Sequence, residues 1–182
     1  MKLKDILRDI SVIKSTADMD MEISSVAIDS RRAAPGSLFV AMTGFETDGH
    51  LYIPSAVENG AAAVVCEKAP EGGVPYVIVE NSRAALAAIG ANFYGHPERE
   101  MTFIGVTGTN GKTTTTYLMK SVLEQTVGAK VGLIGTNQNL IGEEVVPTER
   151  TTPESLELFG LFRRMADAGC THVVMEVSSH AL

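Results

Sequence analysis

The glycine-rich stretch at residues 102–114 constrains the fold of this chain more than any other feature. A β-rich apolar run leads into a glycine-rich turn that opens a helix, and the turn and first helical residues are Gly108, Thr109, Asn110, Gly111, Lys112, Thr113 and Thr114. Such a turn lets backbone N–H groups converge on phosphate oxygens, and the helix N-terminus adds partial positive charge. Lys112 supplies a full charge, and the Thr113 hydroxyl is placed to ligate Mg²⁺. The stretch therefore indicates a nucleoside triphosphate site.

The spacing of the two glycines departs from the general phosphate-loop pattern. That pattern has four residues between its glycines, whereas only two separate Gly108 from Gly111. The alternative is a left-handed turn that caps a helix and leaves Lys112 solvated. The hydroxyls at residues 113–116 favour the phosphate site, because four consecutive β-branched residues are poor helix formers.

Composition narrows the class of protein. The 182 residues suit one domain or two small ones, and 45% hydrophobic content is ample for a core. A net charge of -7 argues against general nucleic-acid binding, which needs a basic surface. We find neither a signal-peptide core nor an apolar run of membrane-spanning length, and we expect no membrane insertion. Cys66 and Cys170 lie in apolar runs and read as buried free thiols, which predicts a cytoplasmic protein.

The pattern of apolar residues predicts a small N-terminal α/β domain. We expect helices at residues 3–13, 52–59 and 82–94, and strands at residues 25–29, 38–42, 62–66 and 76–79. The polar stretch at residues 95–100 contains Gly95 and Pro97. It predicts a boundary between a domain at residues 1–97 and a second domain at residues 98–182.

The alternating strands and helices expected in residues 98–182 predict the start of a mostly parallel α/β domain of the phosphate-loop type. We expect strands at residues 101–107, 130–135 and 171–177, a hairpin at residues 140–146, and helices at residues 112–126 and from Thr152 onward. Ligands bind beyond the carboxyl ends of parallel strands, so the loop and Glu176 should face one crevice. So few elements leave a sheet edge bare, which suggests the front portion of a longer enzyme.

Several residues in the range 98–182 are candidates for metal binding or for contact with a substrate. Glu176 closes an apolar strand, where a carboxylate is costly unless it is paired or bound to metal. It is either a Mg²⁺ ligand across from Thr113 or a structural ion pair or helix-cap acceptor. Thr152 caps the next helix, with Pro153 at the first helical position, and Thr151 is free to present a donor to an anionic substrate. Ser178 is either a turn residue or a polar substrate contact.

The chain resembles the Mur ligase family, whose members use this short glycine spacing. The blocks that carry the resemblance are residues 29–32, 35–41, 48–50, 60–61, 105–115, 151–153 and 176–182. The resemblance implies a UDP-sugar-binding domain at residues 1–97 and the start of a central ATP-binding domain at residues 98–182. The residues that it implies are Ile28 and Ser30 for the UDP-sugar, Gly108 to Thr114 for ATP, Lys112 and Glu176 for catalysis, Thr113 and Glu176 for Mg²⁺, and Thr151, Thr152 and Ser178 for the muramoyl-dipeptide.

The resemblance also implies a reaction. An ATP-dependent ligase would add the third amino acid, diaminopimelate or lysine, to UDP-N-acetylmuramoyl-L-alanyl-D-glutamate through an acyl phosphate, in peptidoglycan biosynthesis. We expect a monomer, and we expect the 182-residue chain alone to be inactive, because the family's carbamylated lysine, a further metal ligand and the third domain lie beyond Leu182. The sequence does not reveal which amino acid is added.

Two other interpretations stay open at this point. The chain could belong to a related ATP-dependent ligase, such as another Mur ligase, a folylpolyglutamate synthetase or a cyanophycin synthetase. The folate enzymes usually have Gly where this chain has Thr113, which speaks against them. The chain could also be a non-catalytic nucleotide-binding module that regulates a partner.

Overall fold

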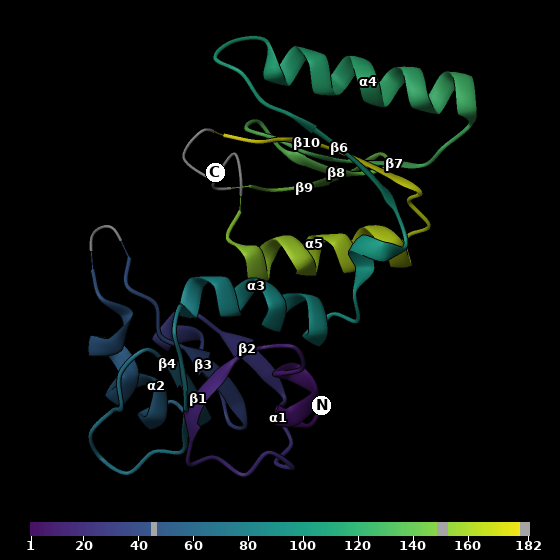
Figure 1. Ribbon diagram of the computed structural model, residues 1–182. Coiled ribbons are helices and arrows are strands. Elements are labelled where there is room, and N and C mark those ends of the chain that lie inside the picture. The colour runs from purple at the N-terminus through teal and green to yellow at the C-terminus, as the bar shows by residue number, and fades with distance from the viewer. Residues whose placement is uncertain (45–46, 149–152, 179–182) are drawn as a thin grey trace. The chain divides into compact units, whose positions relative to one another are not determined.

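The chain folds as two compact units, Met1–Phe93 and Tyr94–Leu182. The computed structural model describes residues 1–44, 47–148 and 153–178. Within these ranges each unit is built around a five-stranded, mostly parallel sheet (Figure 1). The predicted α/β class is therefore confirmed. Among the described residues, no helix combines the length and the apolar character needed to cross a lipid bilayer.

The first unit is a β-sheet flanked by short helices. Its elements are α1 (Leu3–Ile6), β1 (Val12–Ser15), β2 (Ser25–Ala27), η1 (Ser30–Arg32), β3 (Ser37–Val40), η2 (Gly49–Tyr52), α2 (Ile53–Glu58), β4 (Ala61–Cys66), β5 (Tyr76–Val79) and α3 (Ser82–Phe93). The strand order is β1-β5-β4-β3-β2, and only the pairing of β1 with β5 is antiparallel. The carboxyl ends of β2, β3, β4 and β5 therefore lie along one edge of this sheet.

Apolar side chains cover both faces of the central strands. Phe39 of β3 and Val64 of β4 belong to a buried cluster with Ile53 of α2. Successive side chains of a strand point to opposite faces, and Leu38 and Ala63 are just as fully buried on the other face. Burial on both faces is the usual setting of parallel strands, and it explains why β3 and β4 read as continuous apolar runs.

The predicted helix at residues 3–13 is wrong in its second half. Helix α1 ends at Ile6, and Asp9 takes a left-handed conformation with φ 63°. The chain then forms β1, in which Val12 pairs with Val79 of β5. The apolar spacing of this segment is helical, but β-branched Val12 and Ile13 and the open edge of β5 favour a strand.

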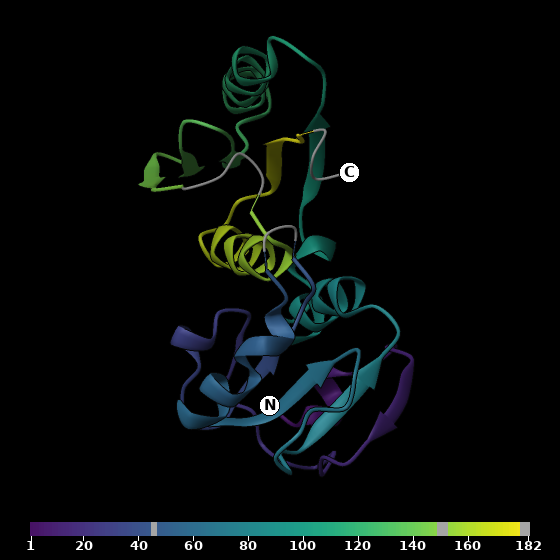
Figure 2. The same cartoon turned by 90° about the vertical axis from the view of Figure 1, so that its left-hand side faces the viewer.

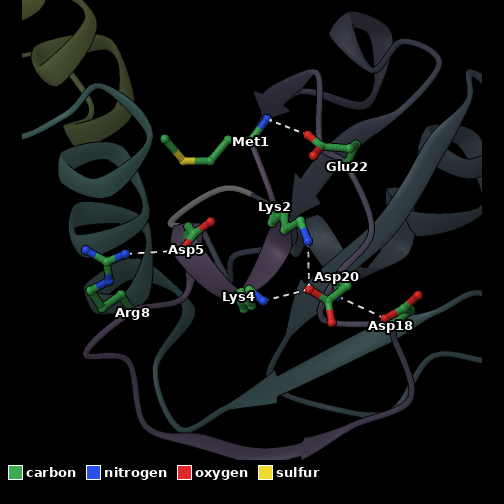
Figure 3. Close-up of polar contacts among 8 residues, drawn as sticks. All are labelled: Met1, Lys2, Lys4, Asp5, Arg8, Asp18, Asp20 and Glu22. Atoms are coloured by element: carbon green, nitrogen blue, oxygen red, sulfur yellow. Dashed lines mark hydrogen bonds and ion pairs between the residues drawn. The ribbon is translucent and has the colours of Figure 1, made fainter.

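Ion pairs tie the short helix α1 to the segment that follows β1. Lys2 and Lys4 both bind Asp20, with Nζ to Oδ1 distances of 3.0 and 2.6 Å (Figure 3). The amino group of Met1 binds Glu22 at 3.0 Å. These groups are exposed, and exposed ion pairs contribute little to stability because solvent screens them. Burial of Leu3 and Ile6 therefore holds α1 in place more than its charges do.

The second unit places helices on both faces of its sheet. Its elements are η3 (Pro97–Arg99), β6 (Thr102–Val106), α4 (Lys112–Val127), β7 (Val131–Ile134), β8 (Asn139–Ile141), β9 (Glu144–Val146), α5 (Ser155–Asp167) and β10 (His172–Glu176). The strand order is β6-β10-β7-β8-β9, with β6, β10 and β7 parallel and the β8–β9 hairpin antiparallel. Helices α4 and α5 lie on opposite faces, as Figures 1 and 2 show. The carboxyl ends of β6, β10 and β7 therefore share one edge.

Helix α5 begins later than predicted. Its N-cap is Glu154, which has an extended backbone and makes no side-chain cap, and Leu158 N donates to Glu154 O at 2.9 Å. The prediction that Pro153 occupies the first helical position is therefore wrong, because the first intrahelical bond starts one residue after it. Thr152, the predicted cap, lies outside the described residues. The apolar face of α5 packs as expected, and the ring centroids of Phe162 and Phe103 lie 4.6 Å apart.

Candidate functional site

The glycine-rich loop connects β6 to α4 and is shaped by two glycines. Gly108 has φ +138° and Gly111 has φ +79°, conformations that other residues adopt only with strain. Gly111 is the N-cap of α4, and its carbonyl accepts the first intrahelical bond from Thr115 N at 2.9 Å. Because glycine has no side chain to cap the first turn, the amides at the start of α4 are left for an anion.

Lys112 folds back over the loop that precedes it. Its ammonium group donates to Gly108 O at 2.7 Å, so a full positive charge lies over the exposed turn. Thr113 is partly buried behind it, and its carbonyl accepts a hydrogen bond from Thr116 Oγ1 at 2.9 Å. Thr116 is fully buried and its hydroxyl serves the helix, whereas Thr114 is exposed. The threonines of this run therefore differ in their surroundings: Thr116 is buried and bonds within the helix, and Thr114 is exposed near the helix start.

Glu176 is a buried carboxylate held by a residue of the neighbouring strand's loop. Its side chain is 1% exposed. Its Oε2 accepts from Thr136 Oγ1 at 3.0 Å, and its Oε1 accepts from Thr136 N at 3.2 Å. A Cβ on Gly135 would lie 2.6 Å from Oε1, so any other residue there would displace the carboxylate from this position. The sequence reasoning missed Gly135 and Thr136 because they follow β7, and only the sheet order brings them to Glu176.

The loop and Glu176 start from the same point of the sheet. Val106, the last residue of β6, pairs with Glu176, the last residue of β10, and Val177 N donates to Val106 O at 2.9 Å. The prediction that these two strand ends share one edge is confirmed. The amides of the loop, a lysine and a carboxylate thus gather where ligands of parallel α/β sheets bind.

The oxygen donors at this edge fit Mg²⁺. The Thr113 hydroxyl and the Glu176 carboxylate are hard ligands, and Mg²⁺ is usually held by one or two carboxylates together with water and substrate phosphates. Among residues 1–44, 47–148 and 153–178, no three His, Cys, Asp or Glu side chains form a metal-binding group. Such a donor set suits an ion that arrives with a nucleotide better than one held by the protein alone.

In the first unit, Ile28 and Ser30 follow the carboxyl end of β2. Ser30 is buried, begins η1, and its carbonyl accepts from Asn59 Nδ2 at 2.9 Å. Between them, Asp29 accepts hydrogen bonds from the backbone and the guanidinium of Arg31. The Arg31 side chain lowers the pKa of Asp29 to about 2. These contacts fix the segment at the strand end, and its binding of a UDP-sugar stays a prediction.

The remaining predicted site residues fall in two groups. Thr151 and Thr152 lie outside the described residues. Ser178 is partly buried and lies two residues beyond Glu176, at the same sheet edge. The roles predicted for all three, and for the loop residues, stay predictions. Cys66 and Cys170 are confirmed as buried free thiols, and burial raises the pKa of both.

Comparison with known proteins matches most of the chain. The model of the Mur ligase family catalytic domain matches residues 22–94, and that of the Mur ligase middle domain matches residues 106–182. A UDP-N-acetylmuramoyl-L-alanyl-D-glutamate–2,6-diaminopimelate ligase from Caldanaerobacter subterraneus subsp. tengcongensis is 51% identical over 185 residues. The match covers 100% of this chain and 38% of that protein, so the chain spans well under half the length of this relative.

Solved structures share the fold. The structure of a UDP-N-acetylmuramoyl-L-alanyl-D-glutamate–2,6-diaminopimelate ligase has a TM-score of 0.77 at 24% identity, and the match covers 99% of this chain and 36% of that one. MurF ligase from Thermotoga maritima, in complex with ADP, has a TM-score of 0.59 at 25% identity, covering 87% and 32%.

Fold and site together define a phosphate-loop α/β protein of two units, with a buried carboxylate beside the loop. The matches to both units identify it further. The chain belongs to the Mur ligase family.

Proposed function

We propose that this chain is the N-terminal and early central part of an ATP-dependent ligase of peptidoglycan biosynthesis. The enzyme would add the third amino acid, diaminopimelate or lysine, to UDP-N-acetylmuramoyl-L-alanyl-D-glutamate. One observation carries the proposal: a phosphate loop and a buried carboxylate share a sheet edge in a chain that is 51% identical throughout to a diaminopimelate-adding ligase. That relative favours diaminopimelate over lysine.

The loop supports the first chemical step, in which the substrate carboxylate attacks the γ-phosphate of ATP, ADP leaves, and an acyl phosphate forms. Two anions must meet, so their repulsion has to be offset. The amides from Gly108 to Thr114 bind the phosphates, and Lys112 exchanges its bond to the Gly108 carbonyl for phosphate oxygens. An amine of the incoming amino acid then displaces phosphate and forms the peptide bond.

Thr113 and Glu176 would hold Mg²⁺ at this edge. The bound ion would neutralise charge on the β- and γ-phosphates. Glu176 is suited to this task because Thr136 fixes both of its oxygens and burial excludes competing water. Loss of one preorganised charge partner typically costs on the order of 3 kcal/mol in the reaction barrier.

The substrate contacts complete the proposal. Ile28 and Ser30 of the first unit would contact the UDP-sugar, which makes residues 1–97 the UDP-sugar domain and residues 98–182 the start of the ATP-binding domain. Thr151, Thr152 and Ser178 would hold the muramoyl-dipeptide. We further propose a cytoplasmic monomer that binds no nucleic acid, consistent with its net charge of -7.

Substrate-dependent ATP hydrolysis by the full-length enzyme tests this function. Phosphate release should require both UDP-N-acetylmuramoyl-L-alanyl-D-glutamate and the third amino acid. Stimulation by a folate substrate would instead assign a related ligase. If no candidate substrate stimulated hydrolysis, a non-catalytic nucleotide-binding module would be the better account. The 182-residue chain alone should release no phosphate under the same conditions.

A further inference from the structure

After β3 the chain turns back on itself at the carboxyl edge of the first sheet, where residues on the two sides of the turn are paired. The two arms of this turn, residues 42–44 and 47–49, are joined by backbone contacts. Gly44 N donates to Thr47 O at 2.9 Å, and Gly49 N donates to Met42 O at 2.8 Å. A Cβ on Gly49 would lie 2.6 Å from Met42 O, so the base of the turn closes only with glycine.

His50 joins the base of this turn to the end of the next strand. Its Nδ1 lies 2.6 Å from Asp48 Oδ1, which also accepts from His50 N at 3.0 Å. Its Nε2 accepts from Glu67 N at 3.0 Å. A backbone N–H can only donate, so Nε2 carries no proton and Nδ1–H donates to Asp48. The neutral ring thus bridges the turn after β3 and the residue after β4, and its side chain is only 14% exposed.

The bridge continues from Glu67 to a third strand end. Glu67 Oε1 accepts from Ser82 N at 3.0 Å and from Ser82 Oγ at 2.9 Å. Ser82 is buried and begins α3, which follows β5. The Ser82 amide lowers the pKa of Glu67, which keeps the carboxylate ionised as an acceptor. The connections after β3, β4 and β5 are therefore tied together through one imidazole and one carboxylate.

This edge is also where Ile28 and Ser30 follow β2, and β2 and β3 are adjacent parallel strands. Ligands of parallel α/β sheets bind beyond such strand ends. We infer that His50 is a positioning residue, which holds the turn after β3 in the place where the UDP-sugar binds. The inference rests on the proposed function. The ring contacts the carboxylate of Asp48 and the backbone amide of Glu67, so it acts through the turn.

Three substitutions of His50 separate the two halves of the bridge. His50→Asn keeps a donor for Asp48 but cannot reach Glu67. His50→Gln keeps an acceptor for Glu67 N but loses the donor geometry at Asp48. His50→Ala loses both contacts. The matched control is His96→Ala. His96 also pairs with a carboxylate two residues away, Glu98, at 2.9 Å, but it belongs to the second unit.

Two readouts on the 182-residue chain test the inference. Amide hydrogen exchange by NMR reports the turn through Gly44, Gly49 and Glu67, and calorimetry with UDP-N-acetylmuramoyl-L-alanyl-D-glutamate reports binding. His50→Ala should speed exchange at these amides. If it lowers the population of the positioned turn to about a tenth, Kd rises about tenfold. The Asn and Gln variants should fall between, and His96→Ala should match the wild type.

The outcomes separate the inference from the proposed function. Unchanged exchange at Gly44 and Gly49 in His50→Ala would overturn the positioning role. Faster exchange with an unchanged Kd would overturn its link to the substrate. If the wild-type chain bound no UDP-sugar while a matching domain from the diaminopimelate-adding relative did, the proposed substrate itself would be wrong.

Discussion

The hydrogen bond from Thr136 to Glu176 is a specific test of how the candidate metal ligand is held. Thr136→Val keeps the shape and the β-branch of the side chain but removes the hydroxyl that lies 3.0 Å from Glu176 Oε2. The carboxylate stays 1% exposed, and water cannot readily replace the lost donor. Hydrogen bonds to charged groups contribute about 1.5–3 kcal/mol. The bond from Thr136 N is retained, so we expect the free energy of unfolding to fall by about 2 kcal/mol.

The assay is calorimetric unfolding of the 182-residue chain. For a unit of this size, each kcal/mol lowers Tm by about 4–8 °C, so the transition of the second unit should fall by about 8–16 °C. Thr136→Ser keeps the hydroxyl, and Thr114→Val alters an exposed threonine, so both should stay within about 0.5 kcal/mol of wild type. In a Glu176→Gln background, Thr136→Val should cost less. If Thr136→Val behaved like Thr114→Val, the reasoning about a held carboxylate would fail.

Three further predictions concern charge and burial. Lys112→Ala should abolish phosphoryl transfer in the full-length enzyme, measured as phosphate release, and near-normal turnover would refute the role of Lys112. Burial raises the pKa of Cys66 to about 11 from 9.0, so stability should decline between pH 9 and 11, and Cys66→Ala should remove that part of the decline in urea titrations. Asp29, whose pKa is lowered from 3.8 to about 2 by Arg31, contributes stability above pH 3.8 that is lost as the pH falls to 2. The stability of Asp29→Asn, followed by circular dichroism, should therefore fall less steeply as the pH is lowered. An acid dependence equal to that of the wild type would contradict the pairing of Asp29 with Arg31.

The parts of the candidate site that depend on local chemistry could be predicted from the sequence, and their roles stay predictions. The loop could be predicted because Gly108, Gly111 and Lys112 lie in a turn between a strand and a helix. Phosphate binding is one explanation that accounts for all three residues at once. Glu176 was found because a carboxylate that ends an apolar run needs a partner. Both signals lie within a few consecutive residues, so no knowledge of the sheet order was needed.

The parts that were missed depend on the sheet order. Thr136 meets Glu176 only because β10 lies between β6 and β7. His50 meets Glu67 because β3 and β4 are neighbours, although the two residues are 17 positions apart in the chain. The strand at Val12 was missed for the same reason, because its partner Val79 is adjacent in the sheet but distant along the chain. Pairing partners distant in sequence leave no local pattern to read.

The central claim is that the amides from Gly108 to Lys112 cradle the polyphosphate of ATP, with a metal between Thr113 and Glu176. A crystal structure of the full-length enzyme with a non-hydrolysable ATP analogue and Mg²⁺ tests it most directly. We predict phosphate oxygens on those amides and a metal that joins the Thr113 hydroxyl and the Glu176 carboxylate to the nucleotide, directly or through water. A nucleotide bound elsewhere, with this loop unchanged, would contradict the account.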